Sequence, residues 1–507
     1  MKRYINPTLA QAGLVIVLTL PWLSPFAPGP SPAVVPLLVS LGCLAMLCGT
    51  VSSCGTRLLS PHVIALSLVS AALVSSMLGL IQYLGWSGHL GPWANQTSAG
   101  EAFANLRQRN HFASLLNIGL VCVIWLAQTG RSIPHSPLPA LYAIAFLLGA
   151  GNAVSGSRAG LLQLGMLTLA YGYWHITARH SLNWRLLLAV WLAYGLTAWG
   201  LPVLTDISGG IFSRAVDGSS CAGRRVLWSN VLELIRQKPW FGWGWGELDY
   251  AHYMTLYSSE RFCDILDNAH NLPLHLAVEL GVPFALVVCT AFFWGVLRAR
   301  PWREIDPVRQ MAWGVLALIL LHSLLEYPLW YGPFQIAAGL CIYLLAVARK
   351  QPERTLRLPL GEESGRAGPN YFLAVTAALM TAFVAHAAWD YHRVSQIYQP
   401  YAQRDPAYRE NTLEKIRGTN LFGRQYEFAA LSMTALTPSN ALEINALAIN
   451  LLHYSPEPRV IEKVIESAVM LGHDDEALLH LARYRAAFPV NHARWRRSLT
   501  LTPQVTQ

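Results

Sequence analysis

The chain has 507 residues, of which 53% are apolar and only 13% are charged, and its mean hydropathy is +0.34. Soluble domains usually carry about 25% charged residues, so this composition excludes an ordinary soluble protein. A net charge of +9 can indicate a nucleic-acid partner, but here the basic residues lie in short loops between apolar runs. We therefore expect no nucleic acid and relate the charge to orientation in a membrane.

Apolar runs of about 20 residues, the length that crosses a hydrocarbon core, recur along the chain. They predict an all-α fold class, namely a polytopic membrane helical bundle with about eleven transmembrane helices. The predicted spans are residues 8–26, 32–53, 60–85, 110–128, 137–154, 159–178, 186–203, 272–297, 310–327, 332–348 and 371–389.

Basic residues gather on one side of this predicted bundle, and cytoplasmic loops usually carry the excess of Lys and Arg. An inside N-terminus places the following basic residues inside: Lys2, Arg3, Arg57, Arg131, Arg179, Arg185, Arg298, Arg300, Arg303, Arg309, Arg349, Lys350, Arg354 and Arg357. The short outer loops then hold only Arg107, Arg109 and Arg158. We predict an N-in, C-out topology.

Two hydrophilic segments fall outside under this topology. The predicted domains are a membrane domain, 1–389, with a large outer loop at 204–270, and a helical domain, 390–507. Within the tail, residues 468–489 resemble one tetratricopeptide unit, a pattern typical of protein contacts. A plain helical cap is the alternative.

The eight cysteines include no CxxC pair, so the sequence predicts no metal site. Most lie in predicted spans, where Cys behaves as a small apolar residue. Cys221 and Cys263 lie instead in the large outer loop, where an oxidising compartment favours a disulfide. Two unpaired thiols are the alternative.

Polar residues cluster where the predicted spans meet the outer face, and polar groups in such places are costly and usually functional. The clusters are Gln108–Ala113, Ser155–Gly160, Gly223–Trp228 with the Gly/Trp run Trp240–Gly246, Asn268–Gly281 and His322–Tyr331. In two of them polar residues repeat every four positions: Asn271, His275 and Glu279, then His322 and Glu326. This spacing places each set on one helix face.

These residue types favour the binding of a diphosphate and the removal of a hydroxyl proton. Arginine forks match diphosphate oxygens and can stabilise a leaving group without a metal. A histidine at the membrane edge can act as a general base. Because the sequence holds neither a DxD-like pair nor a nucleotide loop, we expect no metal and no cofactor.

For several of these residues a plainer interpretation competes. Arg225 fits an ordinary solvated arginine, and His275 fits a packing histidine. Glu279 fits a residue that orients a neighbour or caps a helix. The Gly/Trp run favours a turn-rich wall at the membrane interface over a binding loop.

Taken together, the motifs resemble the bacterial O-antigen ligase and polymerase superfamily. The shared features are Arg224-x-x-x-Trp228, then His270-Asn271 and Glu279-x-Gly281, the Ser-x-Ser-Arg-Ala-Gly turn around Arg158, and the pair Asn110-His111. Within the superfamily, Glu326-Tyr327-Pro328 and the C-terminal domain resemble the PglL-type protein O-oligosaccharyltransferases, which glycosylate pilins and other exported proteins. The resemblance runs from about residue 100 onward.

The resemblance implies a role for each matching residue. Arg158 and Arg224, with the neighbouring Arg225, correspond to the diphosphate-binding arginines, and His270 to the catalytic histidine. Supporting residues are Asn110, His111, Asn271, Glu279, His322, Glu326 and Tyr327. Two departures, Arg109 where the family often has Pro and His275 where it often has Gln, concern the substrate contacts and not His270.

The implied activity is the metal-independent transfer of an oligosaccharide from an undecaprenyl-diphosphate-linked donor to a Ser or Thr hydroxyl of a periplasmic protein such as pilin. Its partners are that donor, the acceptor protein and membrane lipid, and its location is the bacterial inner membrane with the site facing the periplasm. The alternatives are an O-antigen ligase that acts on lipid A core and an O-antigen polymerase. From another class, a transporter or lipid flippase should show inverted repeats and broken helices near mid-membrane.

Overall fold

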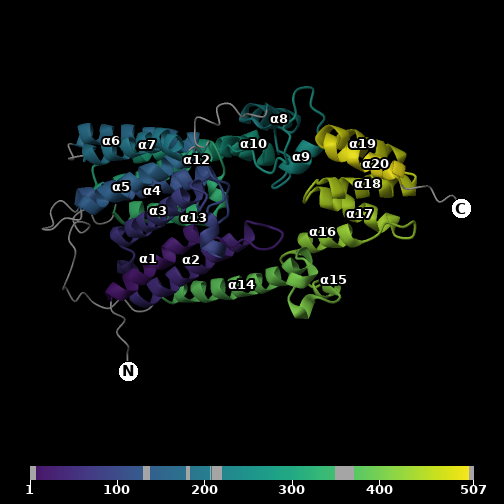
Figure 1. Ribbon diagram of the computed structural model, residues 1–507, viewed down its shortest axis with the longest axis horizontal. Helices are drawn as coiled ribbons and strands as arrows, with labels where there is room; N and C mark the ends of the chain where they lie inside the picture. The colour runs from purple at the N-terminus through teal and green to yellow at the C-terminus, as the bar shows by residue number, and fades with distance from the viewer. Residues whose placement is uncertain are drawn as a thin grey trace. The chain divides into compact units, whose positions relative to one another are not determined.

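The computed structural model describes residues 7–129, 138–178, 183–205, 207, 220–348 and 370–501. Every regular element within these ranges is a helix, which confirms the predicted all-α class for the described chain. The chain forms two compact units (Figure 1). Unit 1 comprises Met1–Asp217 and Gly295–Ala388, and unit 2 comprises Gly218–Trp294 and Trp389–Gln507.

Unit 1 is a bundle of long apolar helices. They are α1 Pro7–Leu23, α2 Val34–Cys54, α3 Pro61–Tyr83, α4 Arg109–Thr129, α5 Leu138–Val154, α6 Arg158–Ala178, α7 Trp184–Thr205, α12 Pro307–Ser323, α13 Gly332–Ala348 and most of α14 Tyr371–Ser395. The central helix is α4, which packs against α3, α5, α6 and α12 and is almost entirely buried. Small residues permit this close packing, since a Cβ at Gly119 would clash with Ala72.

Among the residues that the structure describes, six helices are long and apolar enough to cross a membrane, which agrees with the composition. They are Val34–Cys54, Pro61–Tyr83, Arg109–Thr129, Trp184–Thr205, Val282–Arg303 and Tyr371–Tyr398. The other predicted spans coincide with helices that are shorter or less apolar, so the count of eleven stays a prediction. The basic residues at 2, 3, 131, 179, 349, 350, 354 and 357, used for the orientation, lie outside the described residues.

The predicted span 272–297 is wrong as one continuous helix. The structure has two helices there, α10 Leu272–Leu280 and α11 Val282–Ala299, separated by Gly281. The backbone of Gly281 has a φ of 89°, and a Cβ at this position would clash with the carbonyl of Trp240. A left-handed residue cannot continue a right-handed helix, so the chain turns at this position.

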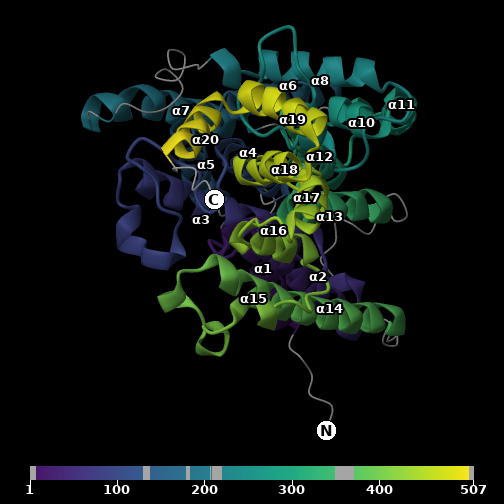
Figure 2. The same cartoon turned by 90° about the vertical axis from the view of Figure 1, so that its right-hand side faces the viewer.

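Unit 2 is built from two distant stretches of the chain. The first contains α8 Arg224–Gln237, α9 Leu248–Met254, α10 and most of α11. The second contains α15 Thr412–Lys415, α16 Gly423–Met433, α17 Ala441–Leu452, α18 Pro458–Leu471, α19 Asp474–Ala487 and α20 Pro489–Leu501. In the second stretch α17, α18, α19 and α20 pack in succession (Figures 1 and 2).

The helical hairpin of α18 and α19 follows local sequence signals. Pro458 occupies the first turn of α18, where its missing N–H is not needed. Gly472, with a φ of 70°, ends that helix, and acidic residues from Asp474 onward favour the start of α19. The hairpin covers the predicted tetratricopeptide-like stretch, whose identity as a repeat stays a prediction.

The two stretches of unit 2 share one core. Tyr253 of α9 is buried among side chains of α16 to α19, and its hydroxyl lies 2.9 Å from Nδ1 of His480. Nε of Arg483 donates to the carbonyl of Met254 at 2.8 Å. Nδ1 of His453 lies 2.6 Å from a carboxylate oxygen of Glu247. The described part of the large loop and the C-terminal helices therefore form one body.

A disulfide joins Cys221 and Cys263, whose Cα atoms are 5.4 Å apart. The sequence leaves open a disulfide or two unpaired thiols, and the structure contains the disulfide. The bond closes a loop between residues 42 positions apart around α8 and α9. Residues 206 and 208–219 of the predicted loop lie outside the described residues.

Candidate functional site

A network of buried polar side chains lies at one end of α4, α6 and α12 in unit 1. The carboxylate of Glu326 accepts hydrogen bonds from Nε2 of Gln108 at 3.0 Å and from Nδ2 of Asn110 at 2.8 Å. Glu326 is only 5% exposed, so these amide donors offset part of the cost of burying the carboxylate. The cluster at Gln108–Ala113 and the cluster at His322–Tyr331 are therefore in contact.

The Ser-Gly-Ser-Arg-Ala-Gly turn joins the same network. Ser157 donates through its hydroxyl to Oδ1 of Asn110 at 2.6 Å and accepts from the backbone N–H of Gly160 at 2.9 Å. The second bond is the usual cap of a helix N-terminus, here that of α6. A Cβ at Gly160 would clash with Ala113 and Asn152. Ser157 and Gly160 of the turn therefore each have a structural reason.

Arg158 is the first residue of α6, and its side chain is exposed. Backbone N–H groups at a helix N-terminus carry a partial positive charge that favours anions. The guanidinium of Arg158 adds a full charge and planar donors at this point. The position suits a diphosphate group without any metal.

His322 and His111 are both completely buried in this network. Ser114 donates its single hydroxyl hydrogen to Oε1 of Gln163 at 3.0 Å and lies 2.9 Å from Nδ1 of His322. Nδ1 of His322 must therefore be the donor to Ser114. The ring of His111 packs against His322 and, with centroids 4.1 Å apart, against Tyr331. These histidines belong to the packed support of the site.

In unit 2 the Arg-x-x-x-Trp motif forms the first turn of α8. Arg224 is the first residue of the helix, and Trp228 follows one turn later on the same face. The indole N–H of Trp228 donates to the carbonyl of Ala269 at 3.1 Å. Arg225 is exposed. The tryptophan therefore ties the helix that carries Arg224 to the backbone next to His270.

His270 lies directly before Asn271, the N-cap of α10, in a strained backbone conformation. Its φ is 49°, a left-handed value that is uncommon for a residue other than glycine. Its backbone N–H donates to Oδ1 of Asn268 at 2.9 Å. Asn271 caps α10, since its Oδ1 accepts from the N–H of Leu274 at 3.1 Å. The two asparagines of Asn268-Ala-His-Asn271 fix the backbone that carries the His270 side chain.

A carboxylate that the sequence analysis missed lies near this histidine. Burial raises the pKa of Asp267, and the positive charge that His270 can carry opposes this shift. The charge of Asp267 can therefore stabilise the protonated form of His270. The position of Asp267 three residues before His270 is a weak signal, because the connecting backbone is irregular.

His275 and Glu279 form a buried pair within α10. Nε2 of His275 lies 3.5 Å from Oε2 of Glu279, and both side chains are inaccessible to solvent. Burial lowers the pKa of His275 to about 4, and burial raises the pKa of Glu279 to about 7. The geometry agrees with the interpretation of His275 as a packing histidine.

The Gly/Trp run caps the C-terminal end of α10. The N–H groups of Trp243 and Gly244 donate to the carbonyls of Val278 and Glu279, each at 2.9 Å. The run satisfies carbonyls that have no partner inside the helix. Gly242, with a φ of 69°, packs against the backbone of Glu279, where any side chain would clash. This accounts for Gly242 structurally.

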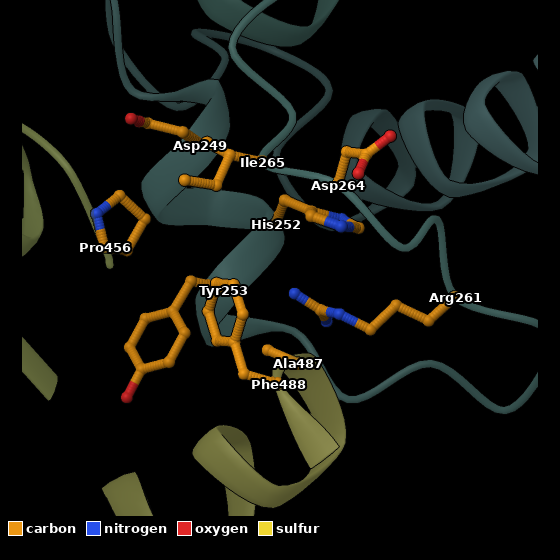
Figure 3. A pocket seen from close by; sticks show the side chains of 9 residues that line it. All are labelled: Asp249, His252, Tyr253, Arg261, Asp264, Ile265, Pro456, Ala487 and Phe488. Carbon is orange, nitrogen blue, oxygen red and sulfur yellow. The ribbon is translucent and has the colours of Figure 1, made fainter. Parts of the chain in front are cut away.

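A small pocket lies elsewhere in unit 2, between α9, residues 261–265 and the tail residues Pro456, Ala487 and Phe488 (Figure 3). Burial, with the nearby charge of Glu247, raises the pKa of Asp249 to about 7. His252 is held by Tyr257 and by the carbonyl of Phe262, at 2.8 and 3.2 Å. Its pKa falls to about 3 because it is buried. His252 is therefore held within the first stretch of unit 2, whereas Tyr253 contacts His480 of the tail.

The predicted site residues thus fall into two groups. Unit 1 holds Asn110, His111, Arg158, His322, Glu326 and Tyr327, and unit 2 holds Arg224, Arg225, His270, Asn271 and Glu279. Across the described part of the chain, no group of three or more His, Cys, Asp or Glu residues is arranged to hold a metal ion. Sequence reasoning missed Ser114 and Gln163, although Asn110, Ser114 and Asn117 share one face of α4.

Three family models match parts of the chain. Residues 143–289 match the O-antigen ligase family, residues 310–501 match the C-terminal region of a virulence factor membrane-bound polymerase, and residues 102–127 match a protein glycosylation ligase. The O-antigen ligase match includes Arg158, Arg224 and His270.

Two curated proteins from Acinetobacter baylyi are similar to the chain. A general O-oligosaccharyltransferase is 27% identical over 305 residues, which are 57% of this chain and 51% of the relative. A ComP-specific O-oligosaccharyltransferase is 25% identical over 252 residues, which are 48% of this chain and 44% of the relative. The chain spans about half the length of each. These matches confirm that the chain resembles the O-antigen ligase superfamily and, within it, the protein O-oligosaccharyltransferases.

Proposed function

We propose that the protein transfers an oligosaccharide from an undecaprenyl-diphosphate-linked donor to a Ser or Thr hydroxyl of an exported protein such as pilin. The observation that carries the proposal is the tie between the arginine motif and the histidine motif, through Trp228 and Ala269. The names of both similar proteins support a protein acceptor. The proposed location is the bacterial inner membrane, with the reaction on the periplasmic side.

In the proposed step His270 removes the proton from the acceptor hydroxyl. The hydroxyl oxygen forms a bond to the anomeric carbon of the glycan, with inversion of configuration. The bond from that carbon to the diphosphate breaks, and its electron pair stays on the lipid diphosphate. Arg158 and Arg224 stabilise the growing negative charge, and Asp267 stabilises the imidazolium that forms.

The test is glycan transfer in membranes that contain a lipid-linked glycan and a candidate pilin. His270→Ala should abolish transfer while donor binding survives, because the imidazole acts on the acceptor proton. Arg158→Ala and Arg224→Ala should weaken donor binding and slow the reaction. Lys at either position should restore only part of the donor binding and transfer, because it lacks the planar fork of the guanidinium. Activity should survive a chelator.

Two exposed residues of the tail provide matched controls. His473→Ala and Arg424→Ala remove the same side chains from partly exposed ion pairs in unit 2 and should leave transfer intact. Near-normal transfer by His270→Ala would exclude the base assignment. Loss of activity with a chelator, restored by a divalent ion, would exclude the metal-independent reaction.

The product separates this function from the alternatives. A glycan-dependent mass increase of the pilin supports the proposal. Glycan on lipid A core without modified protein would identify a ligase, and longer lipid-linked chains would identify a polymerase, the class named by the match over 310–501. Movement of the donor across vesicle membranes without any transfer would identify a flippase.

A further inference from the structure

The Gly/Trp run exposes large aromatic side chains, although its backbone is fixed. We call residues 239–246 the aromatic turn. Trp240 is 72% exposed, Phe241 is 89% exposed and Trp245 is 61% exposed. Exposed aromatics on a soluble surface are unfavourable unless a partner covers them. The proposed transfer chemistry uses none of these three side chains.

The aromatic turn is rigid, so its side chains are presented in a defined way. Its backbone is bonded to Val278 and Glu279 of α10, and the indole N–H of Trp243 donates to the carbonyl of Leu234 at 3.0 Å. Nζ of Lys238 lies 4.0 Å from the ring centre of Trp243. The exposure of the neighbouring rings is therefore not the result of a loose loop.

The aromatic turn is also attached to the first residue of a candidate membrane span. The N–H of Val282 donates to the carbonyl of Pro239 at 2.8 Å, and Gly281 packs against the carbonyl of Trp240. Val282–Arg303 is long and apolar enough to cross a membrane, and only 6% of its most apolar 18-residue stretch is buried inside the protein. If this helix is in the bilayer, Trp240 and Phe241 lie at the level where it enters.

The chemistry of the aromatic turn matches that level of a bilayer. Tryptophan is enriched at the boundary between headgroups and acyl chains, where the ring is in a partly apolar environment and the N–H reaches water. Two exposed basic residues precede the aromatic turn: Arg236, which also pairs with Glu233, and Lys238, which lies over the ring of Trp243. Long basic side chains beside apolar surface can reach lipid phosphates.

We propose that the aromatic turn is a membrane-interface anchor, whose partner is the headgroup–acyl boundary of the bilayer. Because the same turn caps α10, the anchor sets the height of His270 above the membrane. The nine residues of α10 span about 13 Å, so His270 stays within roughly 20 Å of the anchored turn. The inference rests on the membrane span and not on the proposed function.

The test measures which side chains touch lipid. The full chain is prepared in bilayer discs with the six cysteines outside the disulfide changed to Ala. Single cysteines are introduced as Phe241→Cys, as Val287→Cys on the span and as Leu442→Cys on α17. All three positions are exposed apolar residues, at 89%, 68% and 70%. Each is labelled with bimane, and quenching is measured in lipids that carry bromine either near the glycerol or deep in the acyl chain.

We expect the label at 241 to lose at least about half of its emission with bromine near the glycerol. The label at 287 should be quenched more by the deep bromine, and the label at 442 should be quenched by neither. Trp245→Cys repeats the test from a second position of the aromatic turn. If 241 and 245 behave like 442 while 287 is quenched, the proposal is overturned. Blue-shifted emission at 241 without quenching would mean that protein covers the aromatic turn, and this also overturns it.

Discussion

Trp228 connects the two most informative motifs of the chain through a single hydrogen bond. Trp228→Phe keeps the aromatic ring but removes the N–H that donates to Ala269. We expect a fall in kcat of about tenfold with little change in KM for the donor, and a stability loss of about 1 kcal/mol. The measurement is transfer kinetics together with thermal unfolding.

The matched control is Trp243→Phe, which removes an equivalent indole bond to Leu234. It should cost similar stability and leave kcat nearly unchanged, because that bond does not reach His270. Equal kcat losses in the two variants would show that Trp228 has only a general structural role.

Asp249 gives a pH dependence whose sign follows from its raised pKa. Its carboxyl ionises near 7 in the folded protein, against about 3.8 when unfolded. Between these values the folded state binds more protons, so this group makes the protein less stable as pH rises from about 4 to 7. Asp249→Asn should therefore raise the Tm more at pH 8 than at pH 4. A gain that is equal at both pH values would contradict the assignment.

His480, the buried histidine that contacts Tyr253 of α9, gives a pH dependence of stability with the opposite sign. Burial lowers the pKa of His480 to about 4, so its contribution to stability is lost as pH falls from about 6.5 to 4. Asp249→Asn should leave this loss of stability at low pH unchanged. The same unfolding measurement therefore distinguishes the effect of Asp249 from that of His480.

At the residue scale, the sequence predicted which residues form the motifs better than it predicted which residues they contact. Arg224, Trp228 and His270 could be found because their spacing is specific. Ser114 and Gln163 could not, since polar residues inside a long apolar helix do not reveal which neighbour they bond. Asp267 was missed because it lies on an irregular backbone, where spacing does not predict direction.

Gly281 separates α10 from α11, and it should tolerate no side chain. Gly281→Ala would place a Cβ against the carbonyl of Trp240 and force a left-handed backbone on alanine. Gly246 has a similar φ of 78° but open space around it. We expect Gly246→Ala to cost about 1 kcal/mol and Gly281→Ala clearly more, as measured by the Tm of the purified protein. Equal losses would mean that the contact with Trp240 is not tight.

At the element scale, the positions of helices follow from apolar runs, but their interruptions do not. The span predicted at 272–297 is largely apolar, with His275 and Glu279 on one helix face, so periodicity alone gives one helix. The break at Gly281 depends on the aromatic turn, which lies some 40 residues earlier in the chain. Contacts between distant segments thus decide where a helix ends.

At the scale of the whole molecule, unit 2 restricts the membrane topology. Its two stretches share a buried core around Tyr253 and Tyr484, so both must lie on the same side of the membrane. The chain between them must therefore cross an even number of times, whichever way the N-terminus points. Candidate spans Val282–Arg303 and Tyr371–Tyr398 lie between Tyr253 and Tyr484 in the sequence, and the predicted spans at 310–327 and 332–348 keep the number even.

Cysteine labelling in intact cells tests this restriction. Leu256→Cys in the first stretch and Leu442→Cys in the second are both exposed. An impermeant maleimide should label both, and the predicted C-out orientation adds that this occurs without breaking the inner membrane. Labelling of one position alone would contradict the conclusion that both stretches lie on the same side of the membrane.

Because unit 2 is divided between two stretches of the chain, its two parts are synthesised at different times. Residues 295–388 separate the stretches, and ribosomes need roughly 5 to 20 s to make that many residues. During this interval, and until the tail itself is made, Tyr253 and Glu247 lack their partners His480 and His453. Cys221 and Cys263 both belong to the first stretch, so their disulfide can form before the tail exists. It can hold α8 and α9 in place until the last helices of the newly made chain arrive to cover them.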